Sequence, residues 1–420
     1  MAQNKIPVQG RRGERGQTIV LVAISILSLL AMASLAVDLV TLYVAKGQIQ
    51  HAADAAALAG AKAFVDSGLT TNTPPSVALQ TLATTMATQY INTSLPNNLV
   101  AGIAPALSGS PQIFISNNGG DGNPYLTVTL TQTSLPTFFA RIWGVRFASV
   151  SATASAEAYN PSNWQITNGV SVAPTCVKPL LVSNKDPAQG GNPFVDPTTG
   201  AVEANVLGEP IALTSNCGAG PCFTFAPSAG TYFPAAVSGA SSFCPSAASS
   251  SSCNSLAGQY QESVQCCDST VYSCGGNSPN ATIDNVITPI TTLTQTGLQC
   301  AIHASGAGLL QGQDAIDVSN FTSNTGPMQI TPATEPSGAP AGSYVNTSNS
   351  IMTFPIFVPL AGKQVTVVGF LQIFVTQTGP PGADLDGYIV NVVNCSNSGP
   401  TSTVSGGGIS PVPVRLITPP

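Results

Sequence analysis

The feature that most constrains this chain is a long stretch near its start that carries no charge. From Gly16 to Val37 every residue is uncharged, and most are Leu, Ile, Val or Ala. As a helix rising ~1.5 Å per residue, residues 18–37 would extend over ~30 Å, the thickness of the hydrocarbon core of a bilayer. The sequence therefore predicts a single transmembrane helix, with the lipid bilayer as its partner.

The charges on either side of this stretch predict its orientation. Three arginines precede it (Arg11, Arg12 and Arg15), and the acid Asp38 follows it directly. Because positively charged flanks stay on the cytoplasmic side, we expect residues 1–17 to be a basic cytoplasmic segment and the chain after Asp38 to lie outside. Asp38 then marks the end of the membrane segment, at the outer interface, where its carboxylate is expected to reach water.

Two other interpretations of this stretch remain open. Ala31-Met32-Ala33 has the form of a signal-peptidase site, which would make the segment a cleaved secretory signal. The stretch would also suit the buried helix of a soluble protein. A retained anchor is favoured because basic residues flank the start of the stretch and its apolar character continues past the proposed cleavage site to Val37.

An alanine-rich tract continues the helical pattern beyond the membrane segment. Residues 41–66 would form ~39 Å of further helix, and alanine is the best helix former. Small residues recur along one face in steps of four and three; this alanine stripe consists of Ala45, Ile49, Ala52, Ala56, Ala59 and Ala63. Small side chains let a second element approach closely. We therefore predict that the stripe of this exposed helix, within residues 18–66, packs against a sheet or partner helix; the alternative is a solvated spacer.

Together these segments resemble the N-terminal part of the TadG-like proteins of tight-adherence (Flp) pilus-assembly systems. The resemblance lies in "RRGERGQ" (residues 11–17), "LAVDLVTLYVAKGQIQ" (35–50) and "HAADAAALAGA" (51–61). In that family the acid after Leu-Ala-Val, here Asp38, marks the end of the anchor. The resemblance implies a bacterial inner-membrane protein whose partners are other pilus or secretion proteins. It says little about residues 160–420.

The chain departs from two patterns of related proteins. Pilins and pseudopilins carry a Glu shortly after the Gly at which the prepilin peptidase cuts, and Leu21 occupies that position after Gly16. Some larger TadG-like proteins carry a von Willebrand-type domain with an Asp-x-Ser-x-Ser metal motif. The nearest stretch here, residues 317–321, lacks the second Ser. We therefore expect neither pilin processing nor that domain.

Residues 67–160 have the pattern of an α+β unit. Residues 76–90 place apolar side chains at helical spacing behind Ser76 as N-cap; these are Leu79, Leu82, Ala83, Met86 and Tyr90. Residues 124–134 and 147–159 alternate between apolar and hydroxyl side chains, as strands with one buried face do. We expect a short helix between them, at 136–144, opened by a proline. These elements predict a helix packed on a small antiparallel sheet.

All ten cysteines lie in the remaining part of the chain, residues 161–420. They are Cys176, Cys217, Cys222, Cys244, Cys253, Cys266, Cys267, Cys274, Cys300 and Cys395. An even count confined to the exported part favours disulfides, which persist outside the cytosol. A zinc site would need paired C-x-x-C spacing, which is absent from the sequence. We expect Cys244 and Cys253 to tie the serine-rich loop 238–258.

Three strongly apolar segments, 353–360, 363–379 and 386–395, predict strands near the C-terminus. The middle one is apolar on both faces: alternation groups Val365, Val367, Leu371, Ile373 and Val375 against Val368, Phe370 and Phe374. A strand of this kind is covered on both sides. We therefore predict that residues 161–420 form a β-rich, disulfide-containing extracytoplasmic domain.

The composition excludes several classes of function. Only 7% of residues are charged and the net charge is −6, whereas a nucleic-acid-binding domain needs a basic face. The two histidines, His51 and His303, are far apart in the sequence. Asp314 and Asp317, one turn apart on a helix, are expected to be a solvated face rather than a calcium site. We therefore expect no nucleic-acid partner, no cofactor, and no catalytic or metal-binding residues.

Two classes of function fit these observations. The first is a non-enzymatic, membrane-anchored envelope protein of Flp-type pilus assembly or a related secretion apparatus, acting through protein–protein contacts. Its N-terminus would be cytoplasmic and its bulk periplasmic or extracellular. The second is an exported surface enzyme or adhesin that uses the N-terminal segment only for delivery. A nucleophile, base and acid clustered in residues 161–420 would favour the second class, and the sequence offers no such set.

Overall fold

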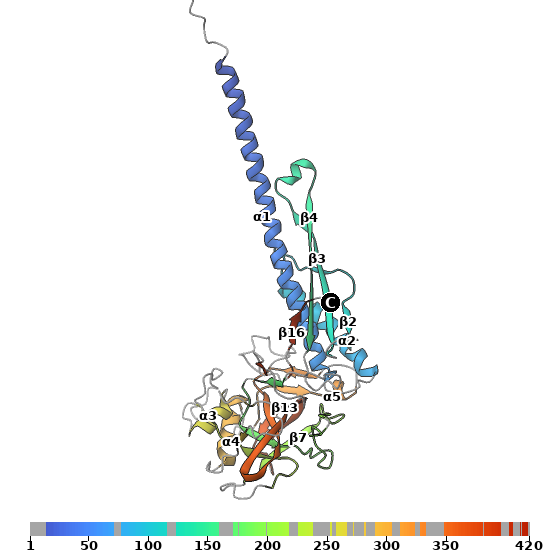
Figure 1. Ribbon diagram of the computed structural model, residues 1–420, viewed down its shortest axis with the longest axis vertical. Helices are drawn as coiled ribbons and strands as arrows, with labels where there is room; N and C mark the ends of the chain where they lie inside the picture. Colours follow the sequence, from blue (N-terminus) through green and yellow to red (C-terminus); the bar gives the residue numbers. More distant parts are fainter. Residues whose placement is uncertain are drawn as a thin grey trace, which may run out of the picture.

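The computed structural model presents a long N-terminal helix, a sheet packed beside its second half, and a separate β-rich body at its far end (Figure 1). The residues that the structure describes are 14–70, 77–115, 123–158, 171–174, 176–198, 200–217, 226–237, 253, 258–266, 272, 281–282, 290–304, 311–323, 328–332, 348–380, 382–395, 403–405, 412 and 414–418. We call the second half of the helix with its sheet the membrane-proximal unit, and the β-rich body the distal unit.

Helix α1 runs without a break from Glu14 to Asp66. Within the described residues, its segment Thr18–Asp66 is the one helix long and apolar enough to cross a membrane. The first turns of α1, before the level of the β3–β4 tip, stand clear of the rest of the molecule (Figure 1). The predicted continuation of an apolar helix into the alanine-rich tract is therefore a single continuous helix.

The sheet of the membrane-proximal unit is antiparallel and centres on a long hairpin. Its strands are β1 (Ala106–Leu107), β2 (Gln112–Phe114), β3 (Tyr125–Pro136), β4 (Phe147–Ala158) and β16 (Val414–Ile417). Their order is β1-β3-β4-β16, and β2 pairs with β3 beyond the end of β1. Helix α2 (Val77–Ser94) and the 3₁₀ turn η1 (Leu95–Asn97) complete the unit. This is the predicted arrangement of helices on an antiparallel sheet.

The alternating patterns behave as expected on β3. Leu126, Val128 and Leu130 are fully buried, whereas the threonines between them are partly exposed. Some of those threonines bond across the hairpin to β4, for example Thr129 Oγ1 to Thr153 Oγ1 at 3.0 Å. One face of the hairpin therefore forms a core and the other carries a ladder of hydroxyl groups.

Two expectations about this unit are wrong. Residues 136–144 do not form a helix opened by the proline, because β3 continues through Pro136 and only the 3₁₀ turn η2 (Ala140–Trp143) follows. Residues 161–420 do not form one separate body, because β16 pairs antiparallel with β4, for example Val414 with Ala158. The C-terminal strand thus returns to the membrane-proximal unit.

The distal unit is built on a seven-stranded mixed sheet, in the order β12-β6-β8-β7-β14-β13-β9. Its strands are β6 (Leu180–Ser183), β7 (Pro210–Ser215), β8 (Thr231–Pro234), β9 (Ala281–Thr282), β12 (Ile351–Pro359), β13 (Gln364–Thr378) and β14 (Leu385–Asn394). An additional pairing of β12 with β13 closes all of these strands except β9 into a ring. A closed ring removes the unpaired edges that an open sheet would expose.

Shorter elements surround this ring. They are α3 (Gln259–Gln265), α4 (Ile290–Ala301), α5 (Ser319–Thr322), η4 (Ala361–Lys363), and two small strand pairs, β5 (Ser171–Ala173) with β15 (Thr403–Ser405) and β10 (Ala315–Asp317) with β11 (Gln329–Thr331). The helices α3 and α4 pack on each other. The three apolar segments predicted as strands correspond to β12, β13 and β14.

The alternation predicted for β13 is interrupted. Ile356 of β12 pairs with Gly369 and Phe357 pairs with Val367, so that one residue bulges out between them. After this bulge the faces exchange. Val365 and Val367 share one apolar cluster with Phe370, while Leu371, Ile373 and Val375 belong to another. The strand is buried on both faces as predicted, but the grouping of its side chains by simple alternation is wrong.

Candidate membrane anchor and packing face

The exposed surface of α1 is apolar over most of its N-terminal half. Large apolar side chains stand exposed from Ile19 to Val44, including Leu21, Leu30 and Leu39. In water such a continuous surface would be strongly unfavourable, because burying apolar surface is worth about 25 cal/mol per Å². These side chains suit contact with lipid tails, as the sequence predicted. The exposed apolar surface also extends six positions beyond Asp38.

Asp38 lies inside this exposed segment and is itself only 4% exposed. Its carboxylate accepts hydrogen bonds from three successive backbone N–H groups at the tip of the β3–β4 hairpin. Oδ1 accepts from Phe138 N at 2.8 Å, and Oδ2 accepts from Phe139 N at 3.0 Å and from Ala140 N at 2.6 Å. These N–H groups lie at the start of η2, where backbone donors have no partner within the turn. Asp38 therefore caps the tip from 100 positions away in the sequence.

The cap determines the charge state of Asp38. The three N–H dipoles stabilise a negative charge on this carboxyl, which is shielded from water. The carboxylate is thus held ionised by backbone dipoles. The expectation that Asp38 reaches water is wrong, since protein N–H groups take the place of water there.

The alanine stripe lies mostly in the core of the membrane-proximal unit. Ala45, Ile49, Ala52, Ala56 and Ala63 are buried, and Ala59 is partly buried. The buried face is wider than the predicted stripe, because Ala53, Ala57 and Ala61 are buried as well. The reason is that α1 is covered by two elements at once, with α2 packing on it as well as the strands β3, β4 and β16.

Gly60 is a packing residue that the sequence analysis missed. A Cβ placed there would lie 2.6 Å from the side chain of Leu126 on β3 and 3.0 Å from that of Ile91 on α2. The glycine therefore allows α1 to approach both elements at once. The only sequence signal was a helix-disfavoured residue within the alanine tract.

Polar groups fasten the edges of this packing face. The ammonium of Lys46 donates to the carbonyl oxygen of Ser151 on β4. At the end of α1, Lys62 and Asp66 form an ion pair at 2.5 Å, and the hydroxyl of Tyr90 on α2 donates to Asp66 at 3.1 Å. Burial, together with the nearby charge of Asp66, raises the pKa of Tyr90. These polar contacts join α1 directly to the neighbouring strand β4 and helix α2.

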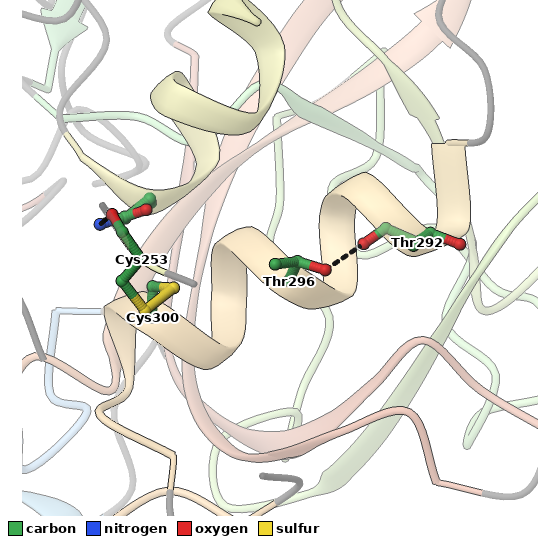
Figure 2. Close-up of a disulfide and its surroundings, with 5 residues drawn as sticks. Cys253, Thr292, Thr296 and Cys300 are labelled. Atoms are coloured by element: carbon green, nitrogen blue, oxygen red, sulfur yellow. Dashed lines mark hydrogen bonds between the residues drawn. A yellow bond between two sulfur atoms is a disulfide. The ribbon is translucent and has the colours of Figure 1, made fainter. Parts of the chain in front are cut away.

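The described cysteines are all engaged in disulfides. Cys253 bonds to Cys300 at the end of α4 (Figure 2), and Cys176, Cys217, Cys266 and Cys395 are also disulfide-bonded. Cys253, one of the two cysteines predicted to tie the serine-rich loop, thus has Cys300 as its partner. The remaining four candidates lie outside the described residues: Cys222, Cys244, Cys267 and Cys274.

A buried polar cluster in the distal unit also escaped the sequence analysis. Asp384, 3% exposed, accepts from Ser215 N and the Tyr232 hydroxyl at 2.8 Å, and from Gln295 Nε2 at 3.2 Å. Burial is the main cause that raises the pKa of Tyr232. The cluster links the start of β14 to β7, β8 and α4, so that it connects the ring to its covering helix.

The other titratable candidates are not brought together. His51 is exposed on α1, whereas His303 lies in the distal unit, with its Nε2 3.1 Å from the amide nitrogen of Asn349. Asp314 directly precedes the strand β10, and Asp317 is its last residue, so the helical spacing assumed for them is wrong. Among the residues that the structure describes, no group of three or more His, Cys, Asp or Glu is placed to hold a metal ion.

Comparison with known proteins concerns α1 alone. The family model described as "Putative Flp pilus-assembly TadE/G-like" matches residues 16–63, which is nearly the whole of α1. Neither a curated protein nor a solved structure gives a significant match to the chain. The N-terminal helix is therefore similar to the TadE/G-like segment of Flp pilus-assembly proteins, which confirms the resemblance seen in its motifs.

Proposed function

We propose that this chain is a non-enzymatic, membrane-anchored envelope protein that serves Flp-type pilus assembly through protein–protein contacts. The observation that carries the proposal is the continuity of α1, which is exposed and apolar in its first half and buried in a folded unit in its second. The folded unit is therefore joined to the membrane segment by an uninterrupted helix. The match of α1 to a TadE/G-like pilus-assembly family model supports Flp-type pilus assembly as the system.

The proposed topology places the N-terminus in the cytoplasm and both folded units outside the inner membrane. The three arginines before the apolar segment support this orientation. The disulfides of the distal unit support it independently, because such bonds persist in the periplasm and are rare in the cytosol.

The non-enzymatic part of the proposal has its own support. The two described histidines lie in different units, His51 on α1 and His303 in the distal unit. The buried carboxylate of Asp384 is engaged with three donors rather than directed into a cavity. Asp38 is likewise held by backbone groups. Both serve as internal fasteners of the fold, which suits a structural component.

Gene deletion with complementation tests the function. Cells that lack the chain should lose surface pili, and the full chain should restore them. Replacing residues 1–37 by a cleavable secretory signal would deliver the same folded units without an anchor, and this variant should fail to restore pili. A matched control exchanges residues 18–37 for an unrelated apolar segment of equal length, which preserves anchoring.

The outcomes separate the two classes of function. Pili that persist after deletion would contradict the proposal. If those cells then lost attachment or a surface hydrolytic activity, the exported adhesin or enzyme would be the better description. Complete restoration by the unanchored variant would show that the continuity of α1 with the membrane is not needed.

A further inference from the structure

The tip of the β3–β4 hairpin carries an exposed aromatic surface that the packing of the molecule does not use. Phe138 is 60% exposed and Phe147 is 63% exposed, and Phe139 and Val145 are exposed beside them. Arg141 and Arg146 are exposed on the same tip. The base of the hairpin, in contrast, has its large apolar side chains in the core, as Leu126 and Val128 show. Within β3, β4 and the turn between them, the exposed large apolar side chains thus lie at the tip. Beside the base, Phe114 of β2 and Leu416 of β16 are less exposed than Phe138 and Phe147, at 38% and 44%.

Asp38 determines the position of this tip along the axis of α1. The three hydrogen bonds from Phe138, Phe139 and Ala140 hold the tip against the helix, and Figure 1 shows the hairpin running beside α1 toward its N-terminal half. The exposed apolar side chains of α1 continue past this level, through Tyr43 and Val44. At the level of the tip, the faces of α1 that the hairpin does not cover therefore carry exposed apolar side chains.

The length of that apolar surface places the tip in the lipid interface. Residues 19–44, at ~1.5 Å per residue, extend over ~39 Å. The hydrocarbon core accounts for ~30 Å, and the interfacial layers bring the bilayer to ~40–45 Å. With the hydrocarbon core beginning near Ile19, the core ends near Asp38. The remaining ~9 Å of apolar helix, from Leu39 to Val44, then lies in the outer interfacial layer. Asp38 and the hairpin tip lie where the hydrocarbon core meets this layer.

We propose that the β3–β4 tip is a second, interfacial membrane contact, in which Phe138, Phe139, Val145 and Phe147 enter the outer boundary of the bilayer beside α1. Aromatic rings are favoured at this depth. Arg141 and Arg146 would meet the phosphates of the headgroups, each contributing attraction to anionic lipid. Asp38 positions the tip, so that the membrane-proximal unit contacts the membrane through both α1 and the hairpin tip. The proposal rests on the anchoring part of the proposed function and not on its role in pili.

Tryptophan reporters in the full-length chain test this contact. The chain has two tryptophans, and replacing Trp143 and Trp164 by phenylalanine gives a silent background. Phe138→Trp places a reporter at the tip. Phe114→Trp is the matched control, because Phe114 pairs with Tyr125 at the opposite end of the same hairpin. The eleven steps of β3 from Tyr125 to Pro136 separate the two reporters by ~36 Å.

Both reporter chains are reconstituted into phosphatidylcholine and phosphatidylglycerol vesicles, with or without bromine on the upper acyl chain. An interfacial element lies about 5–10 Å deep, so bromine should remove roughly half or more of the fluorescence of the Phe138→Trp reporter. The Phe114→Trp reporter should be unaffected. Adding Asp38→Asn, which keeps the shape but removes the charge that holds the tip, should reduce the quenching at the tip.

Two results would overturn the contact, and a third would remove its basis. If the Phe138→Trp reporter is unquenched in vesicles that retain the chain, the tip does not enter lipid. Equal quenching of both reporters would mean that the whole unit lies on the membrane, without a specific tip contact. A chain that washes off the vesicles at alkaline pH would instead overturn the anchor itself, which distinguishes that failure from a failure of the tip.

Discussion

The membrane-proximal and distal units reach order by opposite means. The first packs small side chains, with the alanines of α1 against α2 and a hairpin, and no cysteine precedes residue 176. The second packs large side chains, among them Phe233 edge-on to Phe357 at 5.9 Å, and is crosslinked by disulfides. The membrane-proximal unit is thus stabilised by close backbone approach along a long helix, and the distal unit by aromatic packing and covalent crosslinks.

The difference follows from the lengths of the elements. Helix α1 and the long strands β3 and β4 bring many residues together through regular, repeated contacts. The ring of the distal unit includes strands of only four residues, β6 and β8, joined by long connections. Ordering such connections costs about 1–2 kcal/mol of backbone entropy per residue. Crosslinks reduce that cost by restricting the unfolded chain.

Removal of the Cys253–Cys300 disulfide should have the largest effect and should be confined to the distal unit. The bond closes a sequence separation of 47, for which the chain-entropy model gives about 4 kcal/mol of stabilisation. Cys253→Ala combined with Cys300→Ala should therefore lower the free energy of unfolding of the distal unit by about that amount. Hydrogen exchange, followed separately in α4 and in β3, measures both units in one experiment. Equal loss of protection in β3 would contradict their independence.

Overpacking the alanine face should produce the next largest effect, in the other unit. Ala56 is fully buried, so Ala56→Leu should overpack the contact and cost about 1–3 kcal/mol. Ala55→Leu adds the same volume at a partly buried position and should cost less. Leucine keeps nearly all of the helix propensity of alanine, so helix formation is matched between the two variants. Exchange rates in α2 report the difference, and indistinguishable rates would mean that bulk is tolerated at the packing face.

Mild changes of pH should have the smallest effect, with opposite signs in the two units. Burial, partly offset by a bond from Gln189 and reinforced by the charge of Asp186, raises the pKa of Glu209 above its ordinary 4.5. Burial also raises the pKa of nearby Glu203. A raised folded pKa contributes stability that is present below 4.5 and lost as pH rises through the folded value. Acidification toward pH 4.5 should therefore stabilise the distal unit.

Asp38 should respond in the opposite direction and at lower pH. Its carboxylate accepts three backbone hydrogen bonds in the folded state, so protonation at acid pH should weaken the cap and destabilise the membrane-proximal unit. Thermal unfolding scans from pH 7 to pH 3 should show the distal unit gaining stability before the membrane-proximal unit loses it. Glu209→Gln should reduce the gain. A monotonic loss in both units would contradict the assignment.

The parts of the fold that could be predicted are those encoded by local periodicity. Helix α1, the alternating faces of β3 and the strands β12 to β14 all repeat a pattern over many consecutive residues. What could not be predicted depends on distant partners. Strand β16 takes its position from pairing with β4, and Cys253 bonds to Cys300, 47 positions further along the chain. The spacing of residues in the sequence does not determine such partners. The exchange of faces in β13 arises from a single bulge at its pairing with β12.

The same reasoning explains what could be predicted of the candidate site. The apolar segment, its end near Asp38 and most of the alanine stripe follow from residue types along one helix. The cap on Asp38 joins it to Phe138, Phe139 and Ala140, and those N–H groups are backbone donors with no signature in the side chains. A carboxylate in an apolar helix indicates only that some partner is required.

The mature N-terminus of the membrane-bound protein tests the central claim most directly, namely that one retained helix joins the bilayer to the folded units. The membrane fraction is washed with alkaline carbonate, and the retained chain is analysed by intact mass and N-terminal sequencing. We predict that the chain stays in the membrane pellet and keeps residues 17–44. A mature chain that begins at Ser34 and is released by carbonate would contradict this claim, because only four residues would then precede the cap at Asp38.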